Sequence, residues 1–167
     1  MSILDIPVLS LIRRNHGLEH ATLTILSRIR PSVSAAGISF PGGFLIMGEV
    51  ETVDLQAAAR EALERMNNGE HHLAVHPNCG TNFATSGIIA GALAWLGMAG
   101  ARDSKEKRVR LPLVITLVTL SLIYSRALGP IVQEKITTSG YPEGLRIVDI
   151  ISFRTGNMKV HRVITAG

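Results

Sequence analysis

The sequence predicts an α+β membrane protein, in which a two-helix transmembrane hairpin is joined to a small α+β domain. Two apolar segments, residues 81–100 and 111–128, hold much of the hydrophobic content, which is 46% overall. A helix needs about 20 mostly apolar residues to cross a bilayer. Hairpin patterns flank these segments, and a long amphipathic pattern opens the chain. We expect an N-terminal α+β metal-site region (1–80), a transmembrane helical hairpin (81–136) and a C-terminal β-hairpin (137–167) that packs with the N-terminal region.

The opening segment, residues 3–29, is predicted to form an amphipathic helix that ends before Pro31. Apolar side chains recur there at helical spacing, and several arginines lie off the apolar face. Polar residues at 13–16 and 19–20 interrupt the apolar pattern. We therefore expect this helix to lie on the membrane surface, or to pack beneath it, rather than to cross.

Two β-hairpins are predicted, one on each side of the apolar segments. Residues 33–51 form the first, around the turn sequence Pro41-Gly42-Gly43. Residues 145–153 and 158–165 form the second, because apolar and polar residues alternate there around a Thr-Gly-Asn turn. Since two predicted spans separate the hairpins, both lie on the same side of the membrane and can pair into one small sheet.

A surface helix and a short strand are predicted between the first hairpin and the first apolar segment. The helix covers residues 53–67, with Asp54 as its N-cap and an Asn-Asn-Gly sequence at its end. The strand covers residues 72–75 and leads directly into His76-Pro77-Asn78-Cys79-Gly80.

The two apolar segments carry few polar interruptions. Residues 81–100 include no charged side chain, and Gly87 and Gly91 have the spacing that lets another helix approach closely. We expect a homo-oligomer or a larger membrane complex to form through these glycines. The second segment contains Arg126 near its end, which can snorkel or pair with an acidic group. Its helix is expected to continue beyond Pro130.

The net charge of +4, from 17 basic and 13 acidic residues, indicates attraction to anionic lipid headgroups. The densest basic run, residues 102–110, has no interleaved aromatic residues, so nucleic acid is not an expected partner. The positive-inside rule favours a cytoplasmic location for this run. However, we recognise no signal segment that would carry the N-terminal region outward. The segments that flank the two predicted spans on their other sides are basic too. We expect a prokaryotic cell membrane, with the site face on the cytoplasmic side.

His16, Glu19 and His20 form the pattern H-x-x-E-H within the first predicted helix. Positions i, i+3 and i+4 fall on one helix face, so the two imidazoles can bind one cation. The carboxylate beside them can orient or deprotonate a metal-bound water, and the pattern is the inverted form of the zinc-protease motif. Two structural alternatives stay open: the histidines lie at the membrane surface without a metal, or Glu19 pairs with Arg13 or another nearby Arg.

His76 and Cys79 supply a second pair of candidate ligands, an imidazole and a thiolate three residues apart. Nitrogen and sulfur ligands favour zinc over magnesium or calcium. We predict a Zn²⁺ site with these two residues, His16 and His20 as ligands and Glu19 as the catalytic residue. Four protein ligands would close the site, whereas three ligands and a water would leave a catalytic position. The sequence leaves both counts open.

The remaining candidates have structural interpretations. Cys79 is the one cysteine in the chain, which excludes an intrachain disulfide, and it could instead be a buried small residue. His71 and His72 follow the end of a predicted helix, where cationic side chains are favourable, and we expect them at the surface. His161 lies in a predicted strand and is also expected at the surface.

The runs Asn15–Ala21 and His76–Asn82 together resemble the paired motifs of a group of uncharacterised bacterial membrane-protein families. Those families carry HG-x-EH and HP-x-CGT ahead of hydrophobic helices, and some members are labelled predicted metal-dependent enzymes. The resemblance covers residues 13–100 and implies that the five candidate site residues act together, without implying a reaction. This chain has two apolar spans and has Ala21 where the larger family usually has Lys, so any role of that Lys does not carry over.

Two functions of different classes fit these observations. The first is an integral-membrane zinc-dependent hydrolase, with peptidase as the leading reaction. Zinc would lower the pKa of its water toward about 7, Glu19 would take the proton, and the hydroxide would attack a carbonyl. The second is a non-catalytic membrane subunit of a larger complex, stabilised by a structural metal. The sequence leaves open whether the chain is an enzyme, and Glu19 distinguishes the two functions.

Overall fold

Both ends of the chain contribute to one antiparallel sheet with strand order β1-β2-β4-β3, in a computed structural model that describes residues 3–167. The first hairpin consists of β1 (Ala36–Phe40) and β2 (Gly43–Met47), and the second of β3 (Arg146–Thr155) and β4 (Met158–Ala166). β2 pairs with β4, which joins the two hairpins. The prediction of an α+β chain with β-hairpins from both ends is therefore confirmed.

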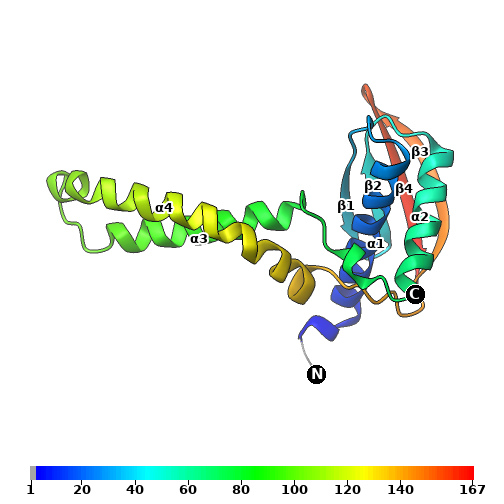
Figure 1. Cartoon of the computed structure of the whole chain (residues 1–167), viewed down its shortest axis with the longest axis horizontal. Coiled ribbons are helices and arrows are strands. Elements are labelled where there is room, and N and C mark those ends of the chain that lie inside the picture. Colours follow the sequence, from blue (N-terminus) through cyan, green and yellow to red (C-terminus); the bar gives the residue numbers. More distant parts are fainter. Residues whose placement is uncertain (1–2) are drawn as a thin grey trace. The chain divides into compact units, whose positions relative to one another are not determined.

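Helices α1 (Pro7–Ile29) and α2 (Thr52–Asn67) lie on one face of this sheet (Figure 1). Short 3₁₀ helices precede α1 (η1, Ile3–Asp5) and follow α2 (η2, His71–Ala74). The core lies between the helices and the inward face of the sheet, where large apolar side chains are fully or almost fully buried: Leu18, Ile25, Phe44, Ile46, Leu55, Met66 and Val163.

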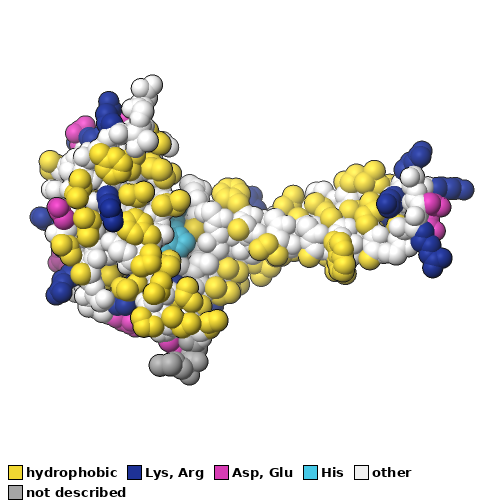
Figure 2. Space-filling view, turned by 180° about the vertical axis from the view of Figure 1, so that it is seen from behind, with side chains coloured by type: hydrophobic (Ala, Val, Ile, Leu, Met, Phe, Trp, Pro, Cys, Tyr) yellow, Lys and Arg dark blue, Asp and Glu magenta, His cyan; other side chains and the backbone are white. Residues whose placement is uncertain are grey.

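The opposite face of the sheet is also rich in apolar side chains. Ile38, Ile151 and Phe153 are exposed there, because they alternate with the inward-facing positions along their strands. Figure 2 shows hydrophobic side chains across this face, with scattered Lys and Arg among them.

The chain divides into two units: residues up to His76 together with 134–167 form the first, and Pro77–Gln133 form the second. The second unit is a pair of packed helices, α3 (Gly80–Met98) and α4 (Ser104–Val132), and α4 continues as a π-helical turn, Gln133–Thr137. The two helices meet through small and polar residues. A Cβ at Gly97 would lie 2.7 Å from Val114, and Ser125 donates a hydrogen bond to Ser86 over 2.7 Å.

Among the residues that the structure describes, one helix is long and apolar enough to cross a membrane, Ser104–Thr137, with a mean hydropathy of 1.8 in its most apolar stretch. α3 does not qualify, because Asn82 and several Gly, Ser and Thr residues lower its hydropathy. The prediction of a two-helix transmembrane hairpin is therefore wrong. A Cβ added at Gly87 or Gly91 would have no neighbouring atom within 4 Å, so these glycines take no part in the packing of α3 on α4.

Three local predictions are also wrong. Residues 72–75 belong mainly to η2 rather than to a strand, because this short segment has no partner strand among the described residues and turns back at the end of α2. Asp54 is not the N-cap of α2, which begins at Thr52; its carboxylate instead accepts a hydrogen bond from Arg30 Nε over 2.7 Å. His161 is not at the surface but fully buried, since its position in β4 faces the helices.

Asn15 connects α1 to both hairpins. Its side-chain amide donates to the carbonyl oxygens of Phe40 and Pro41, each over 3.0 Å, and its Oδ1 accepts from the hydroxyl of Thr165 over 2.7 Å. Asn15 is fully buried, so water cannot readily replace it as the partner of these groups. This one side chain fixes the height of α1 over the sheet one residue before His16.

We expect Asn15→Ala to lower the free energy of unfolding by about 1–3 kcal/mol, because it leaves two part-buried carbonyls and a buried hydroxyl without their partner. Urea unfolding of the detergent-solubilised protein measures this change. Asn67→Ala, at an exposed position at the end of α2, is the matched control and should change stability by no more than about 0.5 kcal/mol. Equal effects of the two substitutions would contradict the role of Asn15.

His161 is held uncharged in the core. Its Nε2 shares a hydrogen bond of 3.0 Å with the hydroxyl of Thr52, while its Nδ1 is buried without a partner. Burial lowers the pKa of His161 below its usual value, and the positive charge of Lys159 lowers it further. Protonation of this ring is therefore less favourable in the folded chain than in the unfolded chain.

The sign of the resulting pH dependence follows from that lowered pKa. Well above pH 6.5 the His161 ring is neutral in both the folded and the unfolded chain, so it costs no stability. As the pH drops below that value, the unfolded chain gains the proton more readily than the folded chain, and the free energy of unfolding falls. Thermal melts between about pH 7.5 and pH 5 should show a smaller loss for His161→Gln than for the unmodified chain. His72→Gln, at an exposed position, should retain the full loss. Parallel curves for all three proteins would contradict the role of His161.

Candidate metal centre

His16 and His20 stand one turn apart on α1, and their rings meet edge to face with centroids 4.3 Å apart. Two backbone carbonyls hold them. His16 Nδ1 lies 2.9 Å from the carbonyl oxygen of Thr137, and His20 Nδ1 lies 2.7 Å from that of Ala74. The carbonyls come from segments far apart in the sequence of the first unit, so the fold itself orients both rings.

These contacts determine which nitrogen of each ring suits a metal. A carbonyl oxygen only accepts hydrogen bonds, so Nδ1 of each ring carries the proton and donates it. In this tautomer of a neutral imidazole, Nε2 carries the lone pair. Metal-binding histidines usually donate their second N–H to a carbonyl or carboxylate in this way, which fixes the tautomer and the ring orientation.

One further candidate ligand of the first unit lies near this pair. The ring of His76 has its centroid 5.7 Å from that of His20. Cys79 follows His76 by three residues and belongs to the second unit. His16, His20 and Cys79 could bind a metal ion, and their nitrogen and sulfur donor atoms suit zinc.

Glu19 is buried against β1 rather than exposed. The hydroxyl of Ser39 donates a hydrogen bond to its Oε2. Gly37, two positions earlier on the same face of the strand, leaves room for the carboxylate, since a Cβ there would collide with Glu19 Oε1. Ser39 and Gly37 thus fix the position of this carboxylate, which neighbours His20 in the sequence.

Several of these positioning groups cannot be identified from the sequence. The carbonyls of Ala74 and Thr137 are backbone atoms, which leave no mark in a sequence motif. Ser39 has a weak signal, because strand alternation places it on the same face as Gly37. The grouping of His16 with His20 follows from helical spacing, whereas the identities of the orienting groups require the fold.

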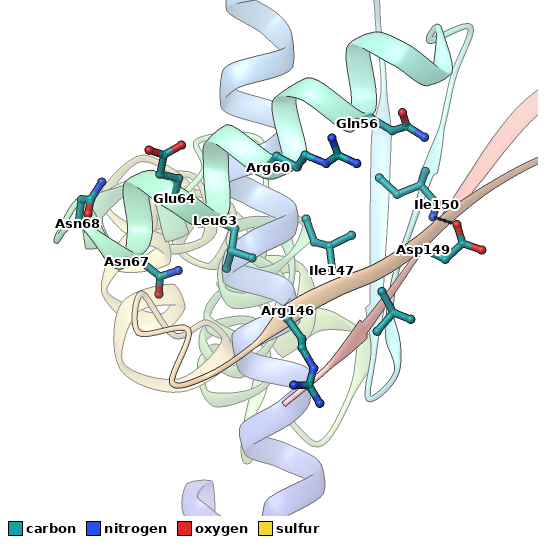
Figure 3. A pocket seen from close by; sticks show the side chains of 11 residues that line it. Gln56, Arg60, Leu63, Glu64, Asn67, Asn68, Arg146, Ile147, Asp149 and Ile150 are labelled. Atoms are coloured by element: carbon teal, nitrogen blue, oxygen red, sulfur yellow. Dashed lines mark hydrogen bonds between the residues drawn. The ribbon is translucent and has the colours of Figure 1, made fainter.

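Another cavity of the first unit contains none of these residues. It has a volume of about 550 Å³ and lies between α2 and the edge strand β3 (Figure 3). Its charged lining residues include two arginines, Arg60 and Arg146, and two acids, Glu64 and Asp149, and no His or Cys lines it. The cavity therefore lacks the donor atoms of the metal centre and carries no strong net charge.

We expect the purified chain to bind one zinc ion, and His20→Ala to lose it, because that change removes a donor that the fold has already oriented. Metal content by mass spectrometry of the protein after dialysis measures this, with circular dichroism to verify folding. His72→Ala is the matched control, since His72 is exposed and outside the cluster. Zinc retained by His20→Ala at the wild-type ratio would contradict the assignment.

Comparison with known proteins places the chain in a family. Residues 11–150 match the family model described as Domain of unknown function (DUF6391). An uncharacterised protein of Picosynechococcus sp. is 31% identical over 137 residues, which cover 77% of this chain and 66% of that relative. The chain thus spans slightly less than two thirds of the relative's length. No solved structure matches. The expectation of an uncharacterised family is confirmed, and the chain belongs to the DUF6391 family.

Proposed function

We propose that this chain is a membrane-associated zinc-dependent hydrolase that acts on carbonyl substrates, with peptides as the leading candidates. The observation that carries the proposal is the oriented imidazole pair, His16 and His20, whose Nδ1 atoms are both held by carbonyls. A buried carboxylate, Glu19, lies one residue before His20 on the same helix. Oriented imidazoles and a fixed carboxylate are the groups that metal-dependent hydrolysis uses.

His16, His20 and Cys79 are the proposed ligands, with His76 as a fourth residue able to join them. A zinc ion bound there would lower the pKa of water toward about 7 and polarise a substrate carbonyl. Nitrogen and sulfur donors support zinc over a hard cation such as magnesium. With three protein ligands the site would keep a position for chemistry, and with four it would be closed.

Glu19 is the proposed general base. Ser39 holds one carboxylate oxygen by a hydrogen bond, and the glycine at position 37 gives the other oxygen, Oε1, its space. We assign the transfer of a proton from water to Oε1. General bases contribute about 10²–10⁴-fold to rate when they are held in position, and the buried contact with β1 supports this role.

We further propose that α4 embeds in a prokaryotic cell membrane and that the histidine pair lies on the cytoplasmic side. The length and hydropathy of Ser104–Thr137 support membrane insertion. Figure 2 shows hydrophobic side chains along the helical unit, and Lys and Arg gathered at one end of it. A non-catalytic subunit with a structural metal is the second candidate, favoured by the open surroundings of Gly87 and Gly91, where a partner helix could approach α3 closely.

Glu19→Gln separates the two functions. The hydrolase proposal predicts that this variant keeps its zinc and loses about 10²-fold or more of its activity on a quenched fluorescent peptide library, because the amide cannot take the proton. Glu61→Gln, an exposed change on α2, is the matched control and should leave activity unchanged. A Glu19→Gln protein with wild-type hydrolysis would contradict the role of Glu19. A zinc-loaded wild-type protein without any hydrolysis would favour the structural metal.

A further inference from the structure

A second cavity, of about 480 Å³, is lined by segments that also hold the histidine pair. Its lining comes from one residue of α1, Arg13, and from two segments, residues 71–75 and 134–141. The carbonyls that hold His16 and His20 belong to these same segments, at Thr137 and Ala74. Because Ala74 both lines the cavity and holds His20, a ligand in this cavity would lie against a residue that contacts the ring of His20.

The lining of this cavity holds more basic than acidic residues. Arg13 and Lys135 line it with one acid, Glu134, together with His71 and His72. Glu134 pairs with the neighbouring Lys135 over 3.3 Å, at an exposed position. Among the ion pairs of the described residues, Arg13 has no carboxylate partner.

Arg13 is fixed in place without being neutralised. Its Nη2 donates to the carbonyl oxygens of Thr138 over 3.1 Å and of Lys135 over 3.4 Å. Its Nε is buried and has no hydrogen-bond partner. Carbonyl oxygens orient a guanidinium but leave its full charge uncompensated, so an anion would find a positioned positive charge here.

Another part of the cavity wall is held in place before any ligand binds. His71 Nδ1 donates to the carbonyl oxygen of Gly140 over 2.8 Å, and the His71 ring stacks on Tyr141 with centroids 4.1 Å apart. Any side chain at Gly140 would collide with His71, because a Cβ would lie 2.7 Å from the His71 Cβ. The amide of Ser139 also donates to the carbonyl of Arg13 over 2.9 Å, which ties this wall to α1.

We propose that this cavity binds an anionic group of the substrate, a carboxylate or a phosphate, and positions the adjoining bond at the metal centre. The inference rests on the proposed hydrolase function and deepens it by naming the substrate class. A carboxylate and a phosphate share the chemistry that a fixed guanidinium recognises, namely two or more oxygens with negative charge. The stacked His71 and Tyr141 rings would contact the apolar part of the same ligand.

Binding is measured on Glu19→Gln protein in detergent, so that turnover does not interfere. The probes are an acetylated dipeptide with a free C-terminal carboxylate, the same dipeptide as its C-terminal amide, and inorganic phosphate, each titrated by calorimetry. The proposal predicts that at least one of the two anions binds and that the amide does not. Preference between the carboxylate and the phosphate identifies the source of the anionic group.

Two added substitutions test the cavity itself. Arg13→Gln and Lys135→Gln should each weaken binding of the preferred anion by about tenfold or more, since each removes a charge that faces the ligand. Lys135 is exposed, so its variant keeps the fold even where loss of the Arg13 hydrogen bonds destabilises the chain. Arg28→Gln, an exposed change at the far end of the same helix, is the matched control and should bind normally.

The outcomes distinguish a failure of the anion site from a failure of the proposed hydrolase function. Two results would overturn the anion site even if the wild-type protein hydrolyses peptides. One is equal affinity for the acid and the amide dipeptide with no binding of phosphate. The other is an anion affinity that does not change in Lys135→Gln and Arg13→Gln. Anion binding that depends on Arg13 and Lys135, in a wild-type protein that hydrolyses nothing, would retain the anion site and reject the hydrolase.

Discussion

The close approach of two backbone segments to one face of α1 is the constraint on which the rest of this structure depends. Gly17 makes that approach possible, because a Cβ at this position would collide with the carbonyl oxygen of Ser139. With Ser139 against the helix, the carbonyl of Thr137 reaches His16, and the carbonyl of Ala74 reaches His20. Asn15 fixes the same helix to both hairpins. The positions of the two imidazoles follow from these contacts.

The chemistry of the site then depends on which hydrogen-bond partners hold the two imidazoles and which partner holds the carboxylate. Each imidazole donates its Nδ1 proton to a backbone carbonyl, which places the lone pair on Nε2, while Glu19 accepts its hydrogen bond from Ser39 on the sheet. Two oriented imidazoles, on a helix that also carries a fixed carboxylate, are the arrangement on which the proposed metal-dependent chemistry rests.

Periodic patterns in the sequence are sufficient to predict the two hairpins, α1 and α2, and the shared helix face of His16, Glu19 and His20. They are not sufficient to predict burial or local structure where contacts between distant segments determine them. His161 lies inside because β4 pairs between two strands and faces the helices, which a strand pattern alone does not reveal. The segment around His72 is a 3₁₀ turn because no strand is available beside it. The absence of charge in α3 suggests a span, but its polar and small residues lower its hydropathy.

The central proposal is a metal centre whose ligands are the Nε2 atoms of His16 and His20 together with the thiolate of Cys79. X-ray absorption at the zinc edge, on the purified chain loaded with one equivalent of zinc, tests it most directly. We predict at least two imidazole nitrogens at about 2.0 Å and one sulfur at about 2.3 Å. A ligand shell made only of oxygen, or one without imidazole scattering, would contradict the claim.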